Sequence, residues 1–229
     1  MQMAFYFDQS RCIGCYACSV ACKDWNNIEA GPAQWRRVTA QERGAYPEVY
    51  LTYVSLSCSH CARPACADAC PVNAIIKNGN NGVMAVNQEE CLGYDACGAC
   101  KKACPYAMPQ FGSEENAKMQ MCTFCNDRLK ENRKPACVDA CPVRALDAGP
   151  MEELQATYGK VTEVSGFTYS NATKPSILFK PRYKQNPSPQ SRTPNPDKPE
   201  PKLTAKTKKE TKKIEFGTQE LTKVKTKIS

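Results

Sequence analysis

The sequence predicts an α+β fold in which short strands and short helices carry four cysteine-rich loops. Two observations lead to this prediction. All sixteen cysteines of the 229-residue chain fall into four groups of four. Short apolar runs with β-branched and aromatic residues precede, separate and follow these groups, as expected of short strands.

The cysteine spacing is typical of iron–sulfur proteins. The first group has the spacing C-x2-C-x2-C-x3-C, the spacing found in bacterial ferredoxins. Three thiols of such a loop can reach three irons of one cubane, whereas the fourth thiol ligates another cluster. The other groups repeat this plan with some longer gaps. In chain order the groups are Cys12, Cys15, Cys18 and Cys22; Cys58, Cys61, Cys66 and Cys70; Cys91, Cys97, Cys100 and Cys104; and Cys122, Cys125, Cys137 and Cys141.

Around these loops the sequence predicts short regular elements. Pro71, Pro105 and Pro142 each follow the last cysteine of a group, where proline ends a short helix, whereas Lys23 follows Cys22. Strands are expected at residues 4–8, 33–40, 48–56, 72–76, 82–86 and 176–179, with a turn at 78–81 and helices at the end of the first group and at 151–158.

The positive charge is concentrated at one end of the chain. Of the net +8, residues 183–229 hold +7, from twelve basic and five acidic residues, and the rest of the chain holds only +1. A cysteine-rich part that is nearly neutral does not indicate nucleic-acid binding. The basic, Pro/Lys-rich segment cannot bury enough apolar surface to order itself, so it is expected to be extended and bound to a partner, or else plainly disordered.

Other uses of cysteine fit the sequence less well. The N-terminus shows neither the basic segment nor the apolar segment of a secretion signal, which argues against a disulfide framework. Zinc modules use two pairs of ligands, whereas these cysteines come as three plus a separate fourth. No stretch approaches the length of a membrane helix, so a membrane anchor would belong to a partner. No nucleophile–base pair, phosphate loop or dinucleotide signature is visible, so catalysis is expected only in a partner.

Several short motifs occur together with these groups: Cys58-Ser-His60-Cys61-x2-Pro64, Cys104-Pro105-Tyr106 and Cys141-Pro142-x-Arg-Ala-Leu146. With these motifs, residues 3–180 resemble the electron-transfer subunit of dimethyl-sulfoxide-reductase-type molybdopterin oxidoreductases. The resemblance implies two ferredoxin-like, β-α-β type modules, the second inserted into the first. The implied divisions are 1–54 and 112–182 for the first module, 55–111 for the inserted module, and 183–229 for the tail.

The resemblance also implies which cysteines share a cluster. The implied sets are Cys12, Cys15, Cys18 and Cys141 for cluster 1; Cys122, Cys125, Cys137 and Cys22 for cluster 2; Cys58, Cys61, Cys66 and Cys104 for cluster 3; and Cys91, Cys97, Cys100 and Cys70 for cluster 4. In the third group Tyr94 stands three residues before Cys97, where a regular run would have cysteine. Either Cys91 reaches the fourth iron, giving four [4Fe-4S] clusters, or Tyr94 occupies that corner, leaving three [4Fe-4S] and one [3Fe-4S]. Four thiolates are available, which favours the first.

A few other side chains are expected near the clusters. His60 is interpreted as packing near a cluster, because histidine-ligated Rieske centres need two histidines and the chain has one. Lys23, Lys101 and Lys102 lie beside fourth-position cysteines and either favour the reduced clusters or are surface lysines. Three aromatic residues are expected to shield clusters from water or to pack in the core: Tyr16, Trp25 and Phe124.

The resemblance implies a role in electron transfer. The chain would carry electrons between a large molybdopterin catalytic subunit and a membrane quinone-linked subunit or another redox partner. The alternatives are the same role for a hydrogenase or formate dehydrogenase, and a free-standing polyferredoxin. The complex is expected at the outer face of the cytoplasmic membrane, with a cytoplasmic complex as the alternative.

Overall fold

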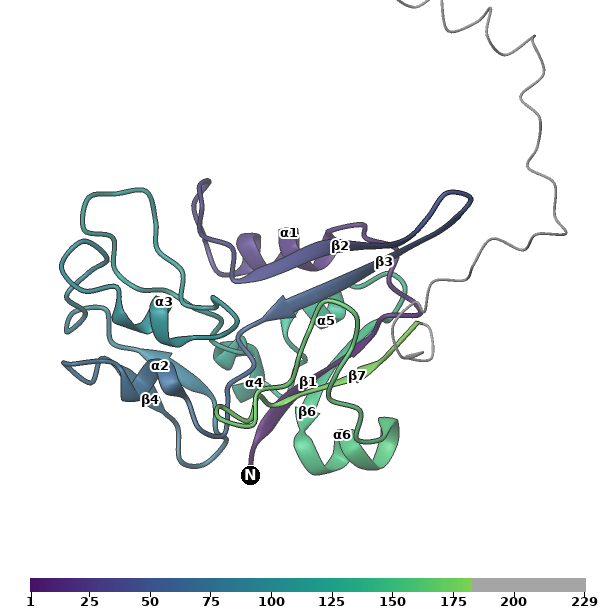
Figure 1. The fold of residues 1–229 in the computed structure, drawn as a ribbon. Coiled ribbons are helices and arrows are strands. Elements are labelled where there is room, and N and C mark those ends of the chain that lie inside the picture. The colour runs from purple at the N-terminus through teal and green to yellow at the C-terminus, as the bar shows by residue number, and fades with distance from the viewer. Residues whose placement is uncertain (183–229) are drawn as a thin grey trace, which may run out of the picture. The chain divides into compact units, whose positions relative to one another are not determined.

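A computed structural model describes residues 1–182, apart from the side chain of Glu48. The extended tail expected from residue 183 lies outside the described residues. The described part is a mixed α/β structure, in which a three-stranded sheet with one covering helix stands at one end (Figure 1). At the other end short helices and a small hairpin support cysteine loops.

The sheet is built around the first strand of the chain. Strand β1 (Met3–Asp8) pairs antiparallel with β6 (Leu146–Pro150) and parallel with β7 (Ile177–Lys180), so the order is β6-β1-β7. The expected strand at the start of the chain and the expected last strand are therefore confirmed. This sheet joins segments from the two ends of the described chain.

All six residues of β1 are buried, because both faces of the sheet are covered. Phe5 and Phe7 point into the main apolar core, which also contains most of the buried cysteines. On the opposite face Tyr6 packs with Leu154 of helix α6 (Met151–Tyr158) and stacks on Tyr158, with 3.8 Å between ring centroids. The helix expected at 151–158 is thus confirmed, and it leaves the Phe5 face free to contact the cysteine loops.

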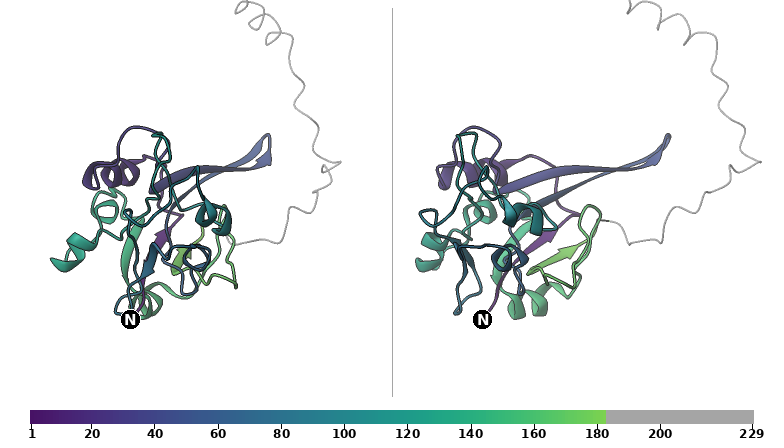
Figure 2. Two further views of the ribbon diagram at one scale, coloured as in Figure 1. Left: turned by 90° about the vertical axis from the view of Figure 1, so that its left-hand side faces the viewer. Right: turned by 60° about the vertical axis from the view of Figure 1, so that its left-hand side comes forward.

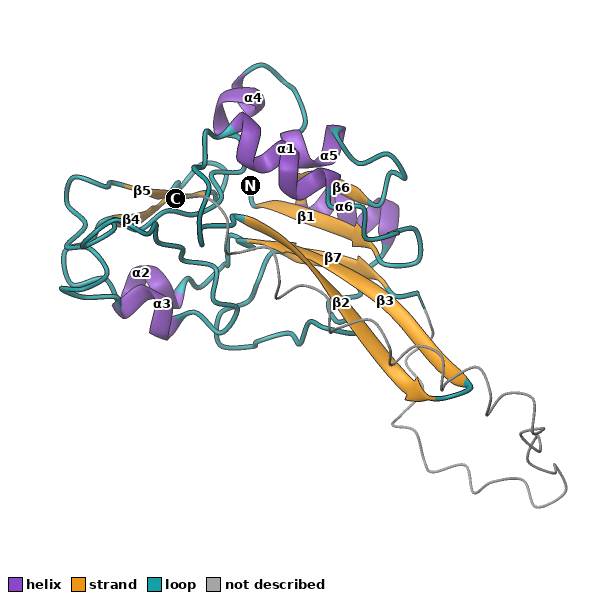
Figure 3. Ribbon diagram, turned by 90° about the horizontal axis from the view of Figure 1, so that it is seen from above, coloured by secondary structure: helices purple, strands orange, loops and turns teal. Residues whose placement is uncertain are grey.

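Strands β2 (Arg36–Ala45) and β3 (Glu48–Ser57) form a hairpin of ten residue pairs. Figures 2 and 3 show it projecting beyond the sheet and helices. Tyr46 at its tip is 93% exposed, whereas Val38 and Val54 near its base are buried. Strand β2 starts later and runs further than the strand expected at 33–40, because pairing with β3 extends it through a polar sequence that has little strand propensity of its own.

Two halves of the cysteine-rich region share a local sequence and a local structure. The sequences Pro64-Ala-Cys-Ala-Asp-Ala-Cys-Pro71 and Pro135-Ala-Cys-Val-Asp-Ala-Cys-Pro142 form helix α2 (Ala65–Asp68) and helix α5 (Ala136–Asp139). In both, the chain after the last proline turns through a left-handed residue, Asn73 or Arg144, whose N–H bonds back to the carbonyl of the last cysteine. The region therefore contains two copies of one structural unit.

The helices pack in the same paired way in both halves. Helix α1 (Ala17–Trp25) packs against α5, and helix α2 packs against α3 (Ala99–Ala103). Proline after the last cysteine ends α2, α3 and α5 within four or five residues, whereas Lys23 allows α1 to continue for nine. The short helix α4 (Asn126–Lys130) follows the first two cysteines of the fourth group, and the expected hairpin is confirmed as β4 (Ile75–Lys77) with β5 (Met84–Val86).

Candidate iron–sulfur centres

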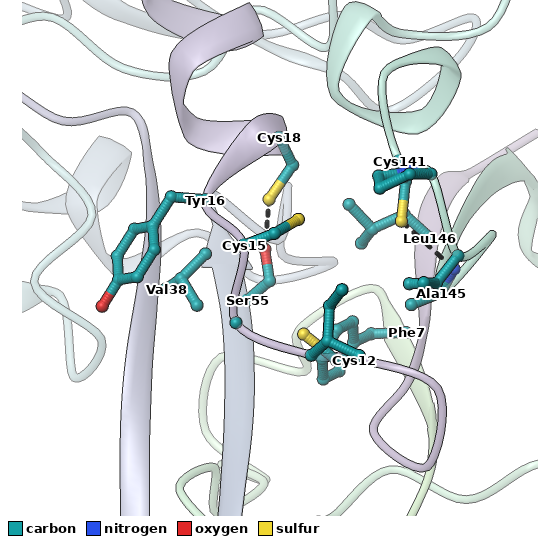
Figure 4. Close-up of a pocket in the computed structure, with 14 residues that line it drawn as sticks. Phe7, Cys12, Cys15, Tyr16, Cys18, Val38, Ser55, Cys141, Ala145 and Leu146 are labelled. Carbon is teal, nitrogen blue, oxygen red and sulfur yellow. Dashed lines mark hydrogen bonds between the residues drawn. The ribbon is translucent and has the colours of Figure 1, made fainter.

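The first set of cysteines comes together at the base of the projecting hairpin. Cys12, Cys15, Cys18 and Cys141 line one cavity with about 320 Å³ of empty space, part of it open to solvent. Figure 4 shows their four sulfur atoms around one space, although Cys141 is more than a hundred residues from the others in the chain. Burial raises the pKa of the Cys12 thiol, and the neighbouring thiolates raise it further.

A second cavity gathers four cysteines at the other end of the cysteine-rich region. Cys70, Cys91, Cys97 and Cys100 line it, and it has about 360 Å³ of empty space. Burial raises the pKa of Cys100 to about 11, and the charges of the other three thiolates contribute to the rise. Tyr94 does not line this cavity, is 45% exposed, and packs against the Phe111 ring, with 4.8 Å between centroids.

The third set lies between these two cavities and is more deeply buried. Burial raises the pKa of the Cys22 thiol, and the charges of Cys122, Cys137 and Cys125 raise it further. Because such effects need short separations in a dry interior, the four thiols are close neighbours. Here too the fourth cysteine of the first run meets three cysteines from the last run.

The fourth set is likewise built from two runs. Burial raises the pKa of Cys66 to about 12, with further contributions from the charges of Cys104 and Cys61. Burial also raises the pKa of Cys58, and the charges of Cys66 and Cys61 contribute. The structure thus brings all sixteen predicted residues into four groups of four, each with three cysteines of one run and the last of another.

Neighbouring groups touch one another through particular pairs of thiols. The charge of Cys18 raises the pKa of Cys137, and the charge of Cys122 raises that of Cys58, after burial in both cases. The charge of Cys100 similarly raises the pKa of Cys66. The four groups therefore form a row in which each group contacts the next.

Backbone amides point at the sulfur atoms of the cysteine loops. The N–H of His60 bonds to Cys58 Sγ and the N–H of Phe124 bonds to Cys122 Sγ, each at 3.4 Å. Both donors have left-handed backbone conformations, which turn their amides inward. The amides that follow the fourth cysteines, Ala74 and Ala145, each bond to a sulfur at 3.2 Å. Such donors stabilise negative charge on sulfur, as iron–sulfur clusters require.

Cys22 receives this support from a side chain instead of a backbone amide. Because helix α1 continues past Cys22, the backbone there does not turn back as it does after the other groups. The side-chain amide of Asn26 donates to the Cys22 carbonyl at 2.8 Å and lies 3.8 Å from Cys22 Sγ.

Several buried polar atoms beside the cysteines have no partner within residues 1–182. They include Arg36 Nε, Ser59 Oγ and His60 Nε2. His60 Nδ1 accepts the N–H of Met84 at 2.9 Å, and burial, with the charges of Lys77 and Arg36, lowers the pKa of the ring to about 3. The ring is therefore neutral with its proton on Nε2. Unsatisfied donors and free thiols around the same spaces fit sulfide-rich, anionic clusters.

His60 thus packs beside the thiols rather than standing among a set of ligands. Its ring lies 5.3 Å from the Phe124 ring in an edge-to-face arrangement, and both residues are fully buried. Phe124 is buried as expected, but burial was wrongly expected for Tyr16 and Trp25, which are 49% and 39% exposed. Both lie at the surface, where Trp25 is held by Asp127 and by the guanidinium of Arg128.

The lysines beside the fourth cysteines make contacts away from the thiols. Lys23 Nζ donates to the Glu29 carbonyl at 3.0 Å. Lys101 Nζ lies 4.7 Å from the centroid of the Tyr94 ring, and Lys102 is exposed. These contacts favour the surface-lysine alternative for all three.

All sixteen cysteines are free thiols. Within residues 1–182 no three His, Cys, Asp or Glu side chains converge closely enough to hold a single metal ion. The thiols that line the two cavities surround a wider space instead, which suits a cluster of several metal ions.

Two overlapping stretches, residues 11–74 and 49–151, each match a family described as 4Fe-4S dicluster domain. The iron–sulfur chain of anaerobic dimethyl sulfoxide reductase from Haemophilus influenzae is 39% identical over 191 residues, 79% of this chain and 89% of that protein. The corresponding chain of the Escherichia coli enzyme is 37% identical, covering 82% of this chain and 92% of that protein. A subunit of sulfite dehydrogenase from Allochromatium vinosum is 31% identical, with coverages of 80% and 84%.

The fold and the grouped thiols, together with these matches, define an iron–sulfur protein with [4Fe-4S] dicluster domains. Within that class, this protein belongs to the family of iron–sulfur subunits that includes the iron–sulfur chain of anaerobic dimethyl sulfoxide reductase. The resemblance drawn from the sequence is thereby confirmed. The chain is a non-catalytic, electron-transferring subunit of an oxidoreductase complex. No helix in residues 1–182 is long and apolar enough to cross a membrane.

Proposed function

We propose that the chain carries four [4Fe-4S] clusters in a row and conducts electrons between a molybdopterin catalytic subunit and a second redox partner. The observation that carries the proposal is the row of four four-thiol groups, each in contact with the next. When bound, each cluster would accept and release one electron. The chain's own residues hold the clusters close together, surround them with amide donors and exclude water from the inner two.

The proposed ligand sets are those of the four groups. The two cavities support the outer sets, and the mutual effects of the thiolates on pKa support the inner sets. From one end of the row to the other they are Cys12, Cys15, Cys18 and Cys141; Cys22, Cys122, Cys125 and Cys137; Cys58, Cys61, Cys66 and Cys104; and Cys70, Cys91, Cys97 and Cys100.

This arrangement corresponds to two nested modules, residues 1–54 with 112–182 and the inserted 55–111. The sheet β6-β1-β7 supports the proposal, because it joins both parts of the outer module. The pairing of α1 with α5 and of α2 with α3 supports it as well. Strand β3 runs across the boundary at 54–55 and so connects the two modules without a flexible linker.

The proposed partners are a large molybdopterin catalytic subunit and a membrane subunit that reacts with quinone. The relatives from dimethyl sulfoxide reductase and sulfite dehydrogenase are each one chain of a multi-subunit enzyme, which supports a catalytic partner. The proposed location is peripheral to the cytoplasmic membrane, on its outer face.

The metal content of the full chain tests this proposal. Anaerobically purified protein is expected to contain about sixteen iron and sixteen sulfide per chain, four of each per cluster, with little zinc. Reduction should produce electron paramagnetic resonance signals of several interacting [4Fe-4S]+ clusters. Zinc in place of iron, or iron sufficient for only two clusters, would contradict the proposal.

The third run provides a separate prediction about its first ligand. Cys91→Ser is expected to remove one iron of the last cluster and to produce an oxidised [3Fe-4S] signal at about g = 2, because Cys91 lines the cavity. Tyr94→Phe is the matched control and should leave the iron content and the spectrum unchanged, since Tyr94 packs outside the cavity. The opposite pattern would assign the corner to Tyr94.

A further inference from the structure

One arginine is fully buried at the point where the projecting hairpin meets the cysteine loops. Arg36 is the first residue of β2 and is 2% exposed. Its NH1 donates to Ser55 Oγ at 3.1 Å and its NH2 to Ser57 Oγ at 2.9 Å. Ser57 is its direct cross-strand partner, and Ser55 follows on the same face of β3, so the pairing of the hairpin fixes the guanidinium. The group lies 4.7 Å from the centroid of the Phe5 ring.

This buried cation has no carboxylate partner among residues 1–182. None of the ion pairs in that part of the chain involves Arg36, and its Nε has no hydrogen-bond partner there. The other buried arginine, Arg128, is instead paired with Asp139. A buried charge without a counter-ion costs several kcal/mol. An anion that belongs beside Arg36 is therefore expected.

The groups that face Arg36 are thiols of the first two proposed sites. Cys137, Cys122 and Cys22 belong to the second site and Cys18 to the first, and the charges of all four raise the pKa of the guanidinium, whereas burial alone would lower it. Ser55 extends the contact toward the first site. Its hydroxyl accepts from Arg36, which leaves its proton free to face Cys18 Sγ at 3.4 Å.

We propose that Arg36 is the internal counter-ion shared by the first and second clusters, and that its charge raises the reduction potentials of both. The inference rests on the proposed four-cluster function. Each cluster takes up one electron from a neighbouring cluster and no proton, so its net charge becomes more negative by one. A fixed positive charge beside it stabilises the reduced form more than the oxidised form. Arginine suits this position because it keeps its charge when buried, whereas a buried lysine can lose its proton.

The test is a redox titration of the full chain followed by electron paramagnetic resonance. With Arg36→Gln, two of the four potentials are expected to move to more negative values and the other two to stay. The expected shift is at least tenfold in the ratio of reduced to oxidised cluster at a fixed potential, about 59 mV for a one-electron couple. Arg43→Gln removes an exposed charge from the same strand and should leave all four potentials unchanged.

Arg36→Lys separates charge from packing. It should keep all four clusters and change the potentials by less than Arg36→Gln does. If Arg36→Gln instead lacks the iron of two clusters while Arg36→Lys retains it, the charge is needed for assembly, which also supports the counter-ion. Equal loss of iron in both variants, equal shifts in both, or unchanged potentials in a fully loaded Arg36→Gln protein would overturn the inference. Absence of four clusters from the parent protein would instead contradict the proposed function.

Discussion

Removal of the clusters is expected to unfold residues 58–111 while much of the sheet β6-β1-β7 with α6 remains. Chelation of iron under anaerobic, reducing conditions should speed amide hydrogen exchange in β4 and β5 by at least about a hundredfold, equivalent to about 2.7 kcal/mol of local stability. Exchange in β1 and α6 should change much less. Hydrogen exchange followed by mass spectrometry of the holo- and apoproteins makes the comparison.

The expected difference follows from how little regular structure the inserted segment contains. Its helices α2 and α3 have four and five residues and its strands β4 and β5 have three each. Helices and two-stranded hairpins of this size are not stable in water by themselves. Four thiols at each of two sites hold the segment together only when a cluster joins them, because cluster binding then contributes directly to folding.

The sheet has other sources of stability, which makes it an internal control. Tyr6, Leu154 and Leu178 form an apolar cluster that contains no cysteine. Asp147 accepts a hydrogen bond from Tyr158 and pairs with Lys134, both at 2.9 Å. If β4 and β5 kept their protection in the apoprotein, the clusters would be functional but not structural. If β1 and α6 lost theirs equally, the two parts would unfold as one unit.

The elements and the groups that the sequence predicted are those whose information is local. Cysteine spacing, the prolines after the last cysteines and the apolar run of β1 each specify their own surroundings, and the structure has them where they were expected. The ten-residue hairpin was predicted less well, because the second half of β2 is polar and is a strand only through its pairing with β3.

Residues whose role depends on tertiary neighbours were missed or misjudged. Nothing local marks Arg36 as buried, and only its place at the start of an apolar hairpin base hints at it. Tyr16 beside Cys15 resembled a shielding residue, but its left-handed backbone conformation at the start of α1 accompanies an exposed ring. Asn26 was also missed, since its contact with Cys22 arises only because α1 continues where the other groups have proline.

Loss of the second cluster is expected to stop electron flow along the row without stopping catalysis in the partner. Cys122 and Cys137 are both buried ligands of the proposed second site, and Cys122 is also the thiol through which that site meets Cys58 of the third. Removing both leaves two thiols, too few to hold a cubane. Electrons would then have to cross from the first site to the third directly, and electron tunnelling falls steeply with distance.

The double variant Cys122→Ala/Cys137→Ala, assayed in the complex with its catalytic and membrane subunits, should lose quinol-driven turnover by about a hundredfold or more, equivalent to about 2.7 kcal/mol of activation free energy. A reduced viologen that reaches the catalytic subunit directly should still support turnover. Thr123→Ala, in the same loop between two ligands, is the matched control and should keep both activities. Iron content lower by about four confirms that one cluster alone is lost. Unimpaired quinol-driven turnover in a protein that lacks those four irons would mean that electrons bypass the second site, and the proposed row would then not be the path.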